Sequence, residues 1–478
     1  MSSTVTLPLW LFLILAVLAL LALAHYLFVP GLRWLVRRRV NAVIEDVNQT
    51  LRVKLPTFQL SSREVLVDRL IHDRQVMDVV ESEAARRGVA RYALMTDVER
   101  YAREMVPAFN AYFYFRLGYW LARTFLRALY TIRTGFAHRA ALAPVAENTT
   151  VVFFINHRSN MDYLLVTYLA SRSAALSYGA GEWCRVWPFR SVMRLAGAYI
   201  LRRNTDDPVY RKVLQRYVQI ATESGVPHAI FGQGQLSRDG MVGPPKLGLL
   251  GYIAKTFDPG GDYDILFIPV ATNFDRVVEE RTLLANVDTD FRGRGSAFVL
   301  ASTGGFLLKQ IWRKLTGNWP GFGIACANFG EPVSLKMWSK ENGIDFSNLD
   351  RDGLFEAVQH LGWDLTERVV RVMPVLPVPA IATALLETDA PLDRAALIRR
   401  TRDLLAEMRR AGAHVVADEA GETAAIEDGL VLLTRRGLIA ERDDQSLAAV
   451  PDERPLLQYH ANSIGQLRSL IDGGSPAQ

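Results

Sequence analysis

Residues 151–162, Val-Val-Phe-Phe-Ile-Asn-His-Arg-Ser-Asn-Met-Asp, join an apolar run directly to a polar segment. An apolar run of this length without alternation is typical of a strand that is buried on both faces of a sheet. His157 leaves the end of this strand, and Asp162 follows within the span of a loop or a first helical turn. A carboxylate there can hydrogen-bond the imidazole and support the positive charge that histidine gains on accepting a proton. His157 and Asp162 are therefore the candidate catalytic pair.

Further apolar runs at residues 229–231 and 265–270 also lead into loops, and helical stretches alternate with them. This alternation predicts an α/β domain over residues 146–375, in which a sheet is flanked by helices. In such sheets the functional loops gather beyond the carboxyl ends of the strands. The polar motifs of this chain lie at those positions.

Basic residues and glycines accompany the other strands of this domain. Arg202 and Arg203 follow an apolar stretch, the segment 232–240 leaves the strand at 229–231, and Lys246 comes shortly after it. Taken singly, such arginines are usually surface residues and such glycines form a turn. Together, guanidinium groups, an ammonium group and glycine N–H groups at strand ends are suited to bind a phosphate monoester. Their order and spacing indicate a site for a phosphorylated substrate.

The N-terminal residues 7–29 contain no formal charge apart from a possible one on His25, and they are long enough for a helix of about 34 Å, slightly more than a bilayer core. Arginines at 33 and 37–39 follow, which predicts a single-pass anchor with the rest of the chain in the cytoplasm. A cleaved signal peptide is the alternative, since Ala22-Leu23-Ala24 resembles a cleavage site, but the basic region that precedes such peptides is missing.

Residues 33–145 are expected to be a helical region, with helices at 63–71 and 97–106. An aromatic, amphipathic run at 111–121 could lie on a membrane surface, although packing against the next domain is the favoured interpretation.

The C-terminal residues 376–478 predict a small winged-helix-like domain, with helices at 393–410 and 424–436 and a hairpin around Asp443-Asp444. Acidic residues crowd the presumed wing, so we expect no nucleic-acid partner.

The net charge of +5 and the pI near 9.1 suit an anionic partner such as a phosphate ester or anionic lipid. The two cysteines, Cys184 and Cys326, lack metal-ligand spacing. We therefore expect no disulfide framework and no structural zinc site.

Four blocks resemble the motifs of the glycerolipid acyltransferase superfamily: H-x4-D at 157–162, G-x-x-x-[IL]-R-R at 197–203, F-x-E-G-x-x-S at 231–237 and an apolar-Pro-apolar strand at 267–270. The segment 157–165 is most similar to the group of bacterial membrane-bound glycerol-3-phosphate acyltransferases and dihydroxyacetone-phosphate acyltransferases. Segments 328–332 and 456–464 resemble later blocks of that group, so the resemblance covers roughly residues 100–470.

This resemblance implies an acyltransferase-type mixed sheet and the transfer of a fatty acyl group from an acyl thioester to glycerol-3-phosphate, a step of phospholipid biosynthesis. His157 would be the general base and Asp162 its orienting partner. Arg202, Arg203, Arg238 and Lys246 would hold the substrate phosphate, and Arg158, Ser159, Gln233, Gly234 and Ser237 would form the substrate-binding loop. The donor would be acyl-CoA or acyl-acyl-carrier protein, without a cofactor or metal. The anchor would place the chain at the inner membrane, among membrane lipids, facing the cytoplasm.

The third block departs from the family pattern. Gln233 stands in place of the family glutamate, Gly232 in place of the usual proline, and Leu236 in place of a common arginine. Glutamine keeps the shape and the hydrogen bonding of glutamate but loses its charge. Two alternatives remain open. The first is an acyltransferase acting on lysophosphatidate or dihydroxyacetone phosphate, because the sequence discriminates poorly between acceptors. The second, which follows from Gln233, is a low-activity relative that binds lipid.

Overall fold

The computed structural model describes Pro8 and residues 55–137, 146, 148–171, 174–181, 189–202, 205–255, 257–285, 321–388 and 391–473. Residues 51–478 form one compact unit. Apart from Pro8, the membrane anchor predicted at 7–29 lies outside the described residues. Among the helices that are described, none combines the length and the apolar character needed to cross a bilayer.

An eight-stranded mixed sheet forms the centre of the described chain. Its strands are β1 (Thr131–Ala137), β2 (Thr149–Ile155), β3 (Ser177–Ala180), β4 (Ala198–Ile200), β5 (His228–Phe231), β6 (Asp264–Phe274), β7 (Ile324–Phe329) and β8 (Val333–Ser334). Seven of them follow the order β1-β7-β6-β2-β5-β3-β4, while β8 pairs with β6. The strands predicted at 151–155, 229–231 and 265–270 are confirmed as β2, β5 and β6, and so is the α/β class with a mixed sheet.

The middle of the sheet is parallel. β2 runs parallel to both β5 and β6, β5 is parallel to β3, and β3 is parallel to β4. β7 is antiparallel to β6 and parallel to β1. The carboxyl ends of four parallel strands, β2, β5, β3 and β4, therefore lie at the same end of the sheet. The residues that follow β2 and β5 leave the sheet side by side.

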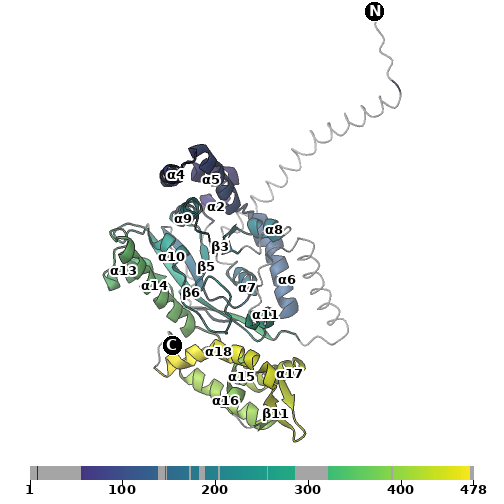
Figure 1. Ribbon diagram of the computed structural model, residues 1–478. Helices are drawn as coiled ribbons and strands as arrows, with labels where there is room; N and C mark the ends of the chain where they lie inside the picture. The colour runs from purple at the N-terminus through teal and green to yellow at the C-terminus, as the bar shows by residue number, and fades with distance from the viewer. Residues whose placement is uncertain are drawn as a thin grey trace, which may run out of the picture. The chain divides into compact units, whose positions relative to one another are not determined.

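Helices cover both faces of this sheet (Figure 1). α9 (Pro208–Glu223), α10 (Leu247–Ala254) and α14 (Arg351–Arg371) pack together on one side, whereas α6 (Tyr119–Leu129) and α7 (Met161–Ala170) pack against each other on the other. α9 begins with Pro208, and the Asp207 carboxylate caps it by accepting from the Val209 N–H.

The N-terminal helices are α2 (Thr57–Leu60), α3 (Arg63–Ile71), α4 (Arg74–Arg87) and α5 (Arg91–Met105), followed by a π-helix at Phe113–Gly118 and by α6. The predictions at 63–71 and 97–106 are confirmed. The prediction of helix up to residue 145 is wrong at Thr131–Ala137, because this segment pairs with the distant strand β7. Tertiary pairing of this kind overrides local helical preference.

The aromatic run at 111–121 is partly buried and partly exposed. Its residues Ala111 and Tyr114 are buried, as expected for packing on a domain, and α6, which begins within the run, contacts α7. Trp120, by contrast, is 58% exposed and Leu121 is 45% exposed.

The C-terminal region has its own three-stranded antiparallel sheet, in the order β10-β11-β9. Its elements are α15 (Pro377–Leu386), β9 (Leu392–Asp393), α16 (Arg394–Arg410), α17 (Glu422–Arg435), β10 (Ile439–Glu441), β11 (Ser446–Ala449) and α18 (Arg454–Ile471). The hairpin and both helices predicted here are confirmed. α15 is buried and contacts α16, α17 and α18. A winged-helix identity stays a prediction.

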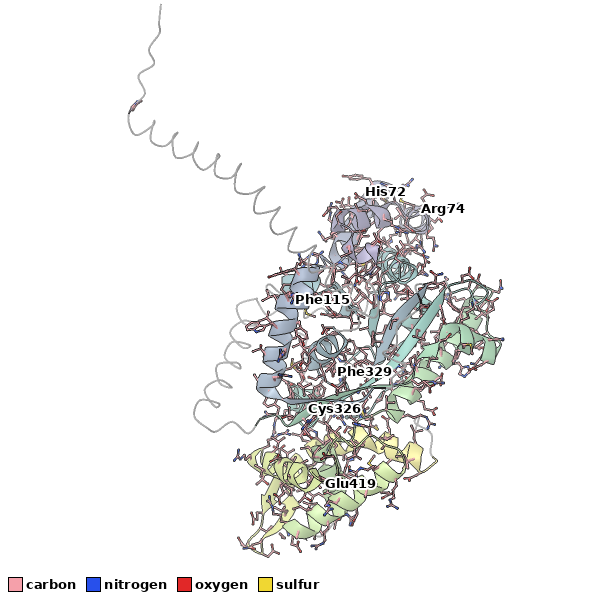
Figure 2. All side chains as sticks on the ribbon, turned by 180° about the vertical axis from the view of Figure 1, so that it is seen from behind. His72, Arg74, Phe115, Cys326, Phe329 and Glu419 are labelled. Carbon is pink, nitrogen blue, oxygen red and sulfur yellow. The ribbon has the colours of Figure 1, made fainter. Side chains whose placement is uncertain are left out.

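Cys326 and Phe329 lie on β7 in the body of the molecule (Figure 2). Burial raises the pKa of the Cys326 thiol to about 12, so this cysteine stays a neutral, apolar packing group. Cys184 lies outside the described residues.

Candidate active site

His157 stands directly beyond the carboxyl end of β2. The preceding residue, Asn156, continues the pairing of β2 with β6 by its side chain. Asn156 Nδ2 donates to the Thr272 carbonyl oxygen at 3.0 Å, and the Thr272 N–H donates to Asn156 Oδ1 at 2.7 Å. The chain therefore leaves the sheet at a defined point.

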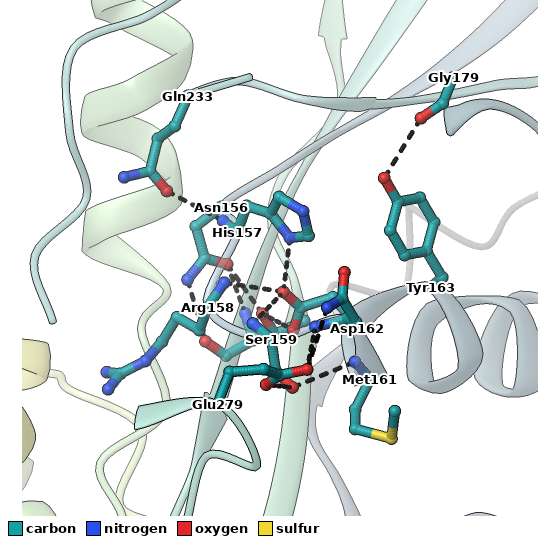
Figure 3. A network of polar contacts seen from close by, with 12 residues as sticks. Asn156, His157, Arg158, Ser159, Met161, Asp162, Tyr163, Gly179, Gln233 and Glu279 are labelled. Carbon is teal, nitrogen blue, oxygen red and sulfur yellow. Dashed lines mark hydrogen bonds and ion pairs between the residues drawn. The ribbon is translucent and has the colours of Figure 1, made fainter. Parts of the chain in front are cut away.

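The Asp162 carboxylate is the centre of a closed hydrogen-bond network at the start of α7 (Figure 3). Asp162 Oδ2 lies 3.0 Å from His157 Nδ1 and accepts the N–H groups of Arg158 at 2.7 Å and Ser159 at 2.9 Å. Asp162 Oδ1 accepts the Thr272 hydroxyl at 2.9 Å. The carboxylate is fully buried, and these donors provide hydrogen bonds to both of its oxygens. The orienting role predicted for Asp162 agrees with this geometry.

The His157 imidazole is 4% exposed and is packed between aromatic rings. Its centroid lies 4.2 Å from that of Phe231 and 5.5 Å from that of Tyr163, whose hydroxyl donates to the Gly179 carbonyl at 3.2 Å. Because Nδ1 faces a carboxylate, the neutral ring carries its proton on Nδ1 and its lone pair on Nε2. Nε2 is thus the atom that can accept a proton from a substrate.

Gln233 connects the His157 loop to the glycine-containing loop after β5. Gln233 Oε1 accepts the His157 backbone N–H at 2.9 Å, and Nε2 donates to the Met241 carbonyl oxygen at 3.3 Å. The side chain is 7% exposed, so both ends of the amide are used inside the protein. A glutamate would keep the first bond but would face the Met241 carbonyl with a carboxylate oxygen.

Close neighbours of this loop leave little room for a side chain at its glycine positions. A Cβ on Gly232 would lie 2.4 Å from the Phe154 ring, so this position has no room for the family proline. Gly234 has a φ of +65°, and a Cβ there would lie 2.9 Å from Lys246 Cγ. Glycine suits both the left-handed backbone and the close approach of the lysine side chain.

Ser237 is a structural residue of the same loop rather than an open substrate contact. Its N–H donates to the His157 carbonyl at 2.8 Å, its hydroxyl donates to the Met241 carbonyl at 2.8 Å, and it accepts the Gly240 N–H at 3.0 Å. The exposed side chains of Arg238 and Lys246 flank this loop. The structure therefore brings Gln233, Gly234, Ser237, Arg238 and Lys246 together next to His157.

Arg158 and Ser159 are held within the protein. Arg158 is 1% exposed and points away from the His157 ring (Figure 3). Its Nη1 donates to Asn273 Oδ1 at 3.1 Å, and its guanidinium lies 5.0 Å from the Tyr459 ring centroid. The Ser159 hydroxyl donates to Glu279 Oε2 at 2.8 Å. The motif places both residues in the predicted substrate-binding loop, but it does not reveal the direction of their side chains.

Glu279 was missed by sequence reasoning. Besides Ser159, it accepts the Asn160 N–H at 3.2 Å and Asn160 Nδ2 at 3.1 Å, and thereby holds the loop between His157 and α7. Burial raises the pKa of this carboxyl group, and the hydrogen bonds from Ser159 and Asn160 oppose that rise. No local signal marks Glu279, because its partners lie about 120 residues earlier.

Arg202 lies at the end of β4, three strands from β2. Its Nη2 is 2.5 Å from Glu104 Oε2, and its guanidinium lies over the rings of Tyr101 and Tyr210. Strand spacing places Arg202 about 14 Å from the strand of His157. Arg203 is outside the described residues. As for metals, no cluster of three or more potential ligand side chains occurs among the residues described.

Two family descriptions match this chain: "Acyltransferase" over residues 137–273 and "Glycerol-3-phosphate acyltransferase C-terminal region" over residues 307–467. Curated relatives include the glycerol-3-phosphate acyltransferases of Pseudomonas fluorescens (strain SBW25) and Pseudomonas aeruginosa (strain LESB58). Each is 26% identical to this chain, and the alignments cover 85% and 78% of this chain and 48% and 44% of the relatives. The chain thus spans about half the length of the curated relatives it matches.

Among solved structures, the 1-acyl-sn-glycerophosphate (LPA) acyltransferase PlsC from Thermotoga maritima is 17% identical. The alignment covers 53% of this chain and 78% of that chain, with a TM-score of 0.29.

Proposed function

The chain belongs to the glycerolipid acyltransferase superfamily, and from this premise we propose that it transfers a fatty acyl group from an acyl thioester to the hydroxyl of glycerol-3-phosphate. The product is lysophosphatidate, an intermediate of phospholipid synthesis. The observation that carries this proposal is the His157 imidazole, whose Nδ1 lies 3.0 Å from the buried Asp162 carboxylate beside the glycine-containing loop.

The chemical step needs one base that later acts as an acid. His157 Nε2 removes the proton of the acceptor hydroxyl as its oxygen attacks the thioester carbonyl carbon. The tetrahedral intermediate then collapses by breaking the carbon–sulfur bond, and the imidazolium returns the proton to the leaving thiolate. Asp162 holds the tautomer throughout and stabilises the transient imidazolium. The acyl group passes directly between substrates, without a covalent enzyme intermediate.

Arg238 and Lys246 would bind the phosphate of the acceptor, because both flank the loop that contacts His157. The backbone N–H groups of Gln235 and Leu236 find no acceptor within the described part of the chain, and they add neutral donors to this site. Arg203 remains a proposed phosphate ligand from its motif. Arg202 is the weaker candidate, since Glu104 and two tyrosine rings occupy its guanidinium.

The proposal includes an acyl donor of the acyl-CoA or acyl-acyl-carrier-protein type and a position at the inner membrane. The uncharged segment 7–29 and the arginines after it support the membrane position. The element order helix, strand, two helices and hairpin supports a winged-helix-like domain at the C-terminus.

The test is acyl transfer by the full-length chain, measured with radiolabelled acyl thioester and a panel of glycerol-3-phosphate, dihydroxyacetone phosphate and lysophosphatidate. We expect lysophosphatidate from glycerol-3-phosphate, and a kcat about 10³-fold lower in His157→Ala, since a general base contributes 10² to 10⁴. His72→Ala, at an exposed histidine, is the matched control. Full activity of His157→Ala would overturn the mechanism, and preference for another acceptor would overturn the substrate assignment.

A further inference from the structure

An arginine-lined cavity of about 750 Å³ lies beyond the edge strand β4, separate from the loops around His157. It is bounded by α3, by α5, by α8 (Phe189–Leu195) and by the residues that end β4. Five arginines line it: Arg63, Arg100, Arg103, Arg190 and Arg202. Its size falls in the range of cavities that hold small organic ligands.

The positive charges of this cavity exceed the negative ones. Glu99 and Glu104 are the acidic lining residues, so five guanidinium groups face two carboxylates. Glu99 Oε1 lies 2.9 Å from Arg103 Nε, and Glu104 pairs with Arg202. Three further charges adjoin the lining: Arg194, Glu64 and Asp97. Including them still leaves an excess of two positive charges.

Arg190 is the arginine best placed to receive a ligand. Its side chain is exposed, and its guanidinium makes no hydrogen bond or ion pair with any described residue. In contrast, Arg63 and Arg194 donate to the Val106 carbonyl at 3.3 and 2.8 Å, and both also donate to the carbonyl of Arg103 near the end of α5. The cap that they form fixes one wall of the cavity.

These like charges lie close enough to repel one another. Burial and the charges of Arg103 and Arg190 lower the pKa of Arg63, although Glu64 opposes this. Burial and the charges of Arg63 and Arg190 lower the pKa of Arg194 to about 10. A ligand with several negative charges would relieve this repulsion, and guanidinium groups bind phosphate oxygens in pairs.

The cavity and His157 lie along the same end of the sheet. Arg202 follows β4 and His157 follows β2, and parallel pairing through β3 and β5 connects these strands. Three strand spacings separate the backbones of β4 and β2 by about 14 Å. The pantetheine arm of coenzyme A has about the length of four extended residues, also ~14 Å.

We infer that this cavity binds the nucleotide phosphates of a coenzyme A thioester, and that the pantetheine arm carries the acyl group to His157. The inference rests on the proposed function, whose donor it specifies. A concave site of this volume suits a nucleotide better than the convex surface of an acidic carrier protein.

The test measures binding of adenosine 3′,5′-bisphosphate, the nucleotide part of coenzyme A, to the full-length protein by calorimetry. Because this probe has no acyl group, its binding is independent of catalysis. We expect binding at least tenfold weaker in Arg190→Glu and unchanged in Arg399→Glu, which makes the same charge change at an exposed arginine of α16. In acyl-transfer assays, Arg190→Glu should raise the KM for acyl-CoA at least fivefold, with kcat and the KM for glycerol-3-phosphate retained.

Several outcomes would overturn the inference. They are no nucleotide binding at millimolar concentration, equal weakening by Arg190→Glu and Arg399→Glu, or equal binding of inorganic phosphate. A different result would assign the cavity to a carrier protein instead. In that case the nucleotide does not bind, acyl-acyl-carrier protein is the donor, and the KM for this donor depends on Arg190. If acyl transfer is absent but the nucleotide binds through Arg190, the site stands and the proposed reaction fails.

Discussion

Asp162 organises the loop after β2 as well as orienting the His157 imidazole. Its two oxygens receive the backbone N–H groups of Arg158 and Ser159 and the Thr272 hydroxyl in addition to His157. A carboxylate that is buried must be satisfied in this way, because an unpaired buried charge is strongly destabilising. The same bonds hold the loop in the shape that would present Nε2 of His157 to a substrate in the proposed reaction.

The Gln233 side-chain amide takes the place of the charged carboxylate that the family pattern has at this position. It accepts from the His157 N–H and donates to the Met241 carbonyl, so it connects the catalytic loop with the loop proposed to bind phosphate. This observation favours an adapted enzyme over a low-activity relative, because the glutamine satisfies both neighbours.

We predict that Gln233→Glu lowers kcat/KM for glycerol-3-phosphate about tenfold, since a lost hydrogen bond at a buried site costs roughly 1–3 kcal/mol. The carboxylate would face the Met241 carbonyl oxygen and loosen the connection between the loops. Steady-state kinetics measure this change, and Gln445→Glu at an exposed turn is the matched control. A gain of activity in Gln233→Glu would contradict the prediction and favour the low-activity relative.

At the scale of elements, α18 contacts both loops of the site. Tyr459 lies beneath the Arg158 guanidinium, and Asn462 Nδ2 donates to the Asp239 carbonyl at 2.9 Å. Gln466 accepts the Val242 N–H at 2.7 Å and donates to its carbonyl at 3.0 Å. These residues recur every three or four positions, so one face of the helix supports the loops.

The approach of α18 is close. A Cβ on Gly240 would lie 2.0 Å from the Tyr459 carbonyl oxygen, and Gly240 has a φ of +91°. Only glycine permits this combination of backbone conformation and contact. The C-terminal helix thus forms part of the wall of the candidate active site.

We predict that Gln466→Leu raises the KM for glycerol-3-phosphate about tenfold with a smaller effect on kcat, because it leaves both backbone groups of Val242 without their partner. Gln466→Glu keeps the bond from the Val242 N–H and should give an intermediate KM. Ser469→Leu, at an exposed position of the same helix, is the control. The prediction would be contradicted if Gln466→Leu, Gln466→Glu and Ser469→Leu all lost kcat and thermal stability to the same extent. Such a result would mean that the substitutions unfold the protein in general.

At the scale of the whole molecule, buried ionisable groups couple stability to pH. His228, on β5, is fully buried, and its Nε2 lies 3.1 Å from the Thr222 hydroxyl. Burial lowers the pKa of His228 to about 4 from its ordinary value of 6.5. Between these two pH values the unfolded chain binds the proton and the folded chain does not, so the free energy of unfolding falls as the pH falls.

We predict that His228 contributes a loss of stability of about 3 kcal/mol between pH 6.5 and pH 4, given ~1.4 kcal/mol per pKa unit. Chemical denaturation across this range measures it. His228→Gln should flatten the dependence, while His72→Gln, at an exposed histidine, should keep it. An unchanged slope in His228→Gln would contradict the assignment.

Several features follow from the residues alone, because they depend on local pattern. The order of residues predicts three of them: the buried strand before His157, the spacing of His157 and Asp162, and the glycine-containing loop after residue 231. The same holds for the helices and hairpin of the C-terminal region, since periodicity and turn residues report secondary structure directly. These features were sufficient to predict the α/β class and the catalytic pair.

Other features depend on contacts between residues far apart in the chain. Pairing with β7 turns residues 131–137 into a strand, Glu279 holds the loop after His157, and α18 supports both loops of the site. Likewise, Arg158 points toward Tyr459, and Arg202 toward Glu104. A motif reports which side chains are present, but their directions are set by partners more than 90 residues away, which only the folded chain brings together.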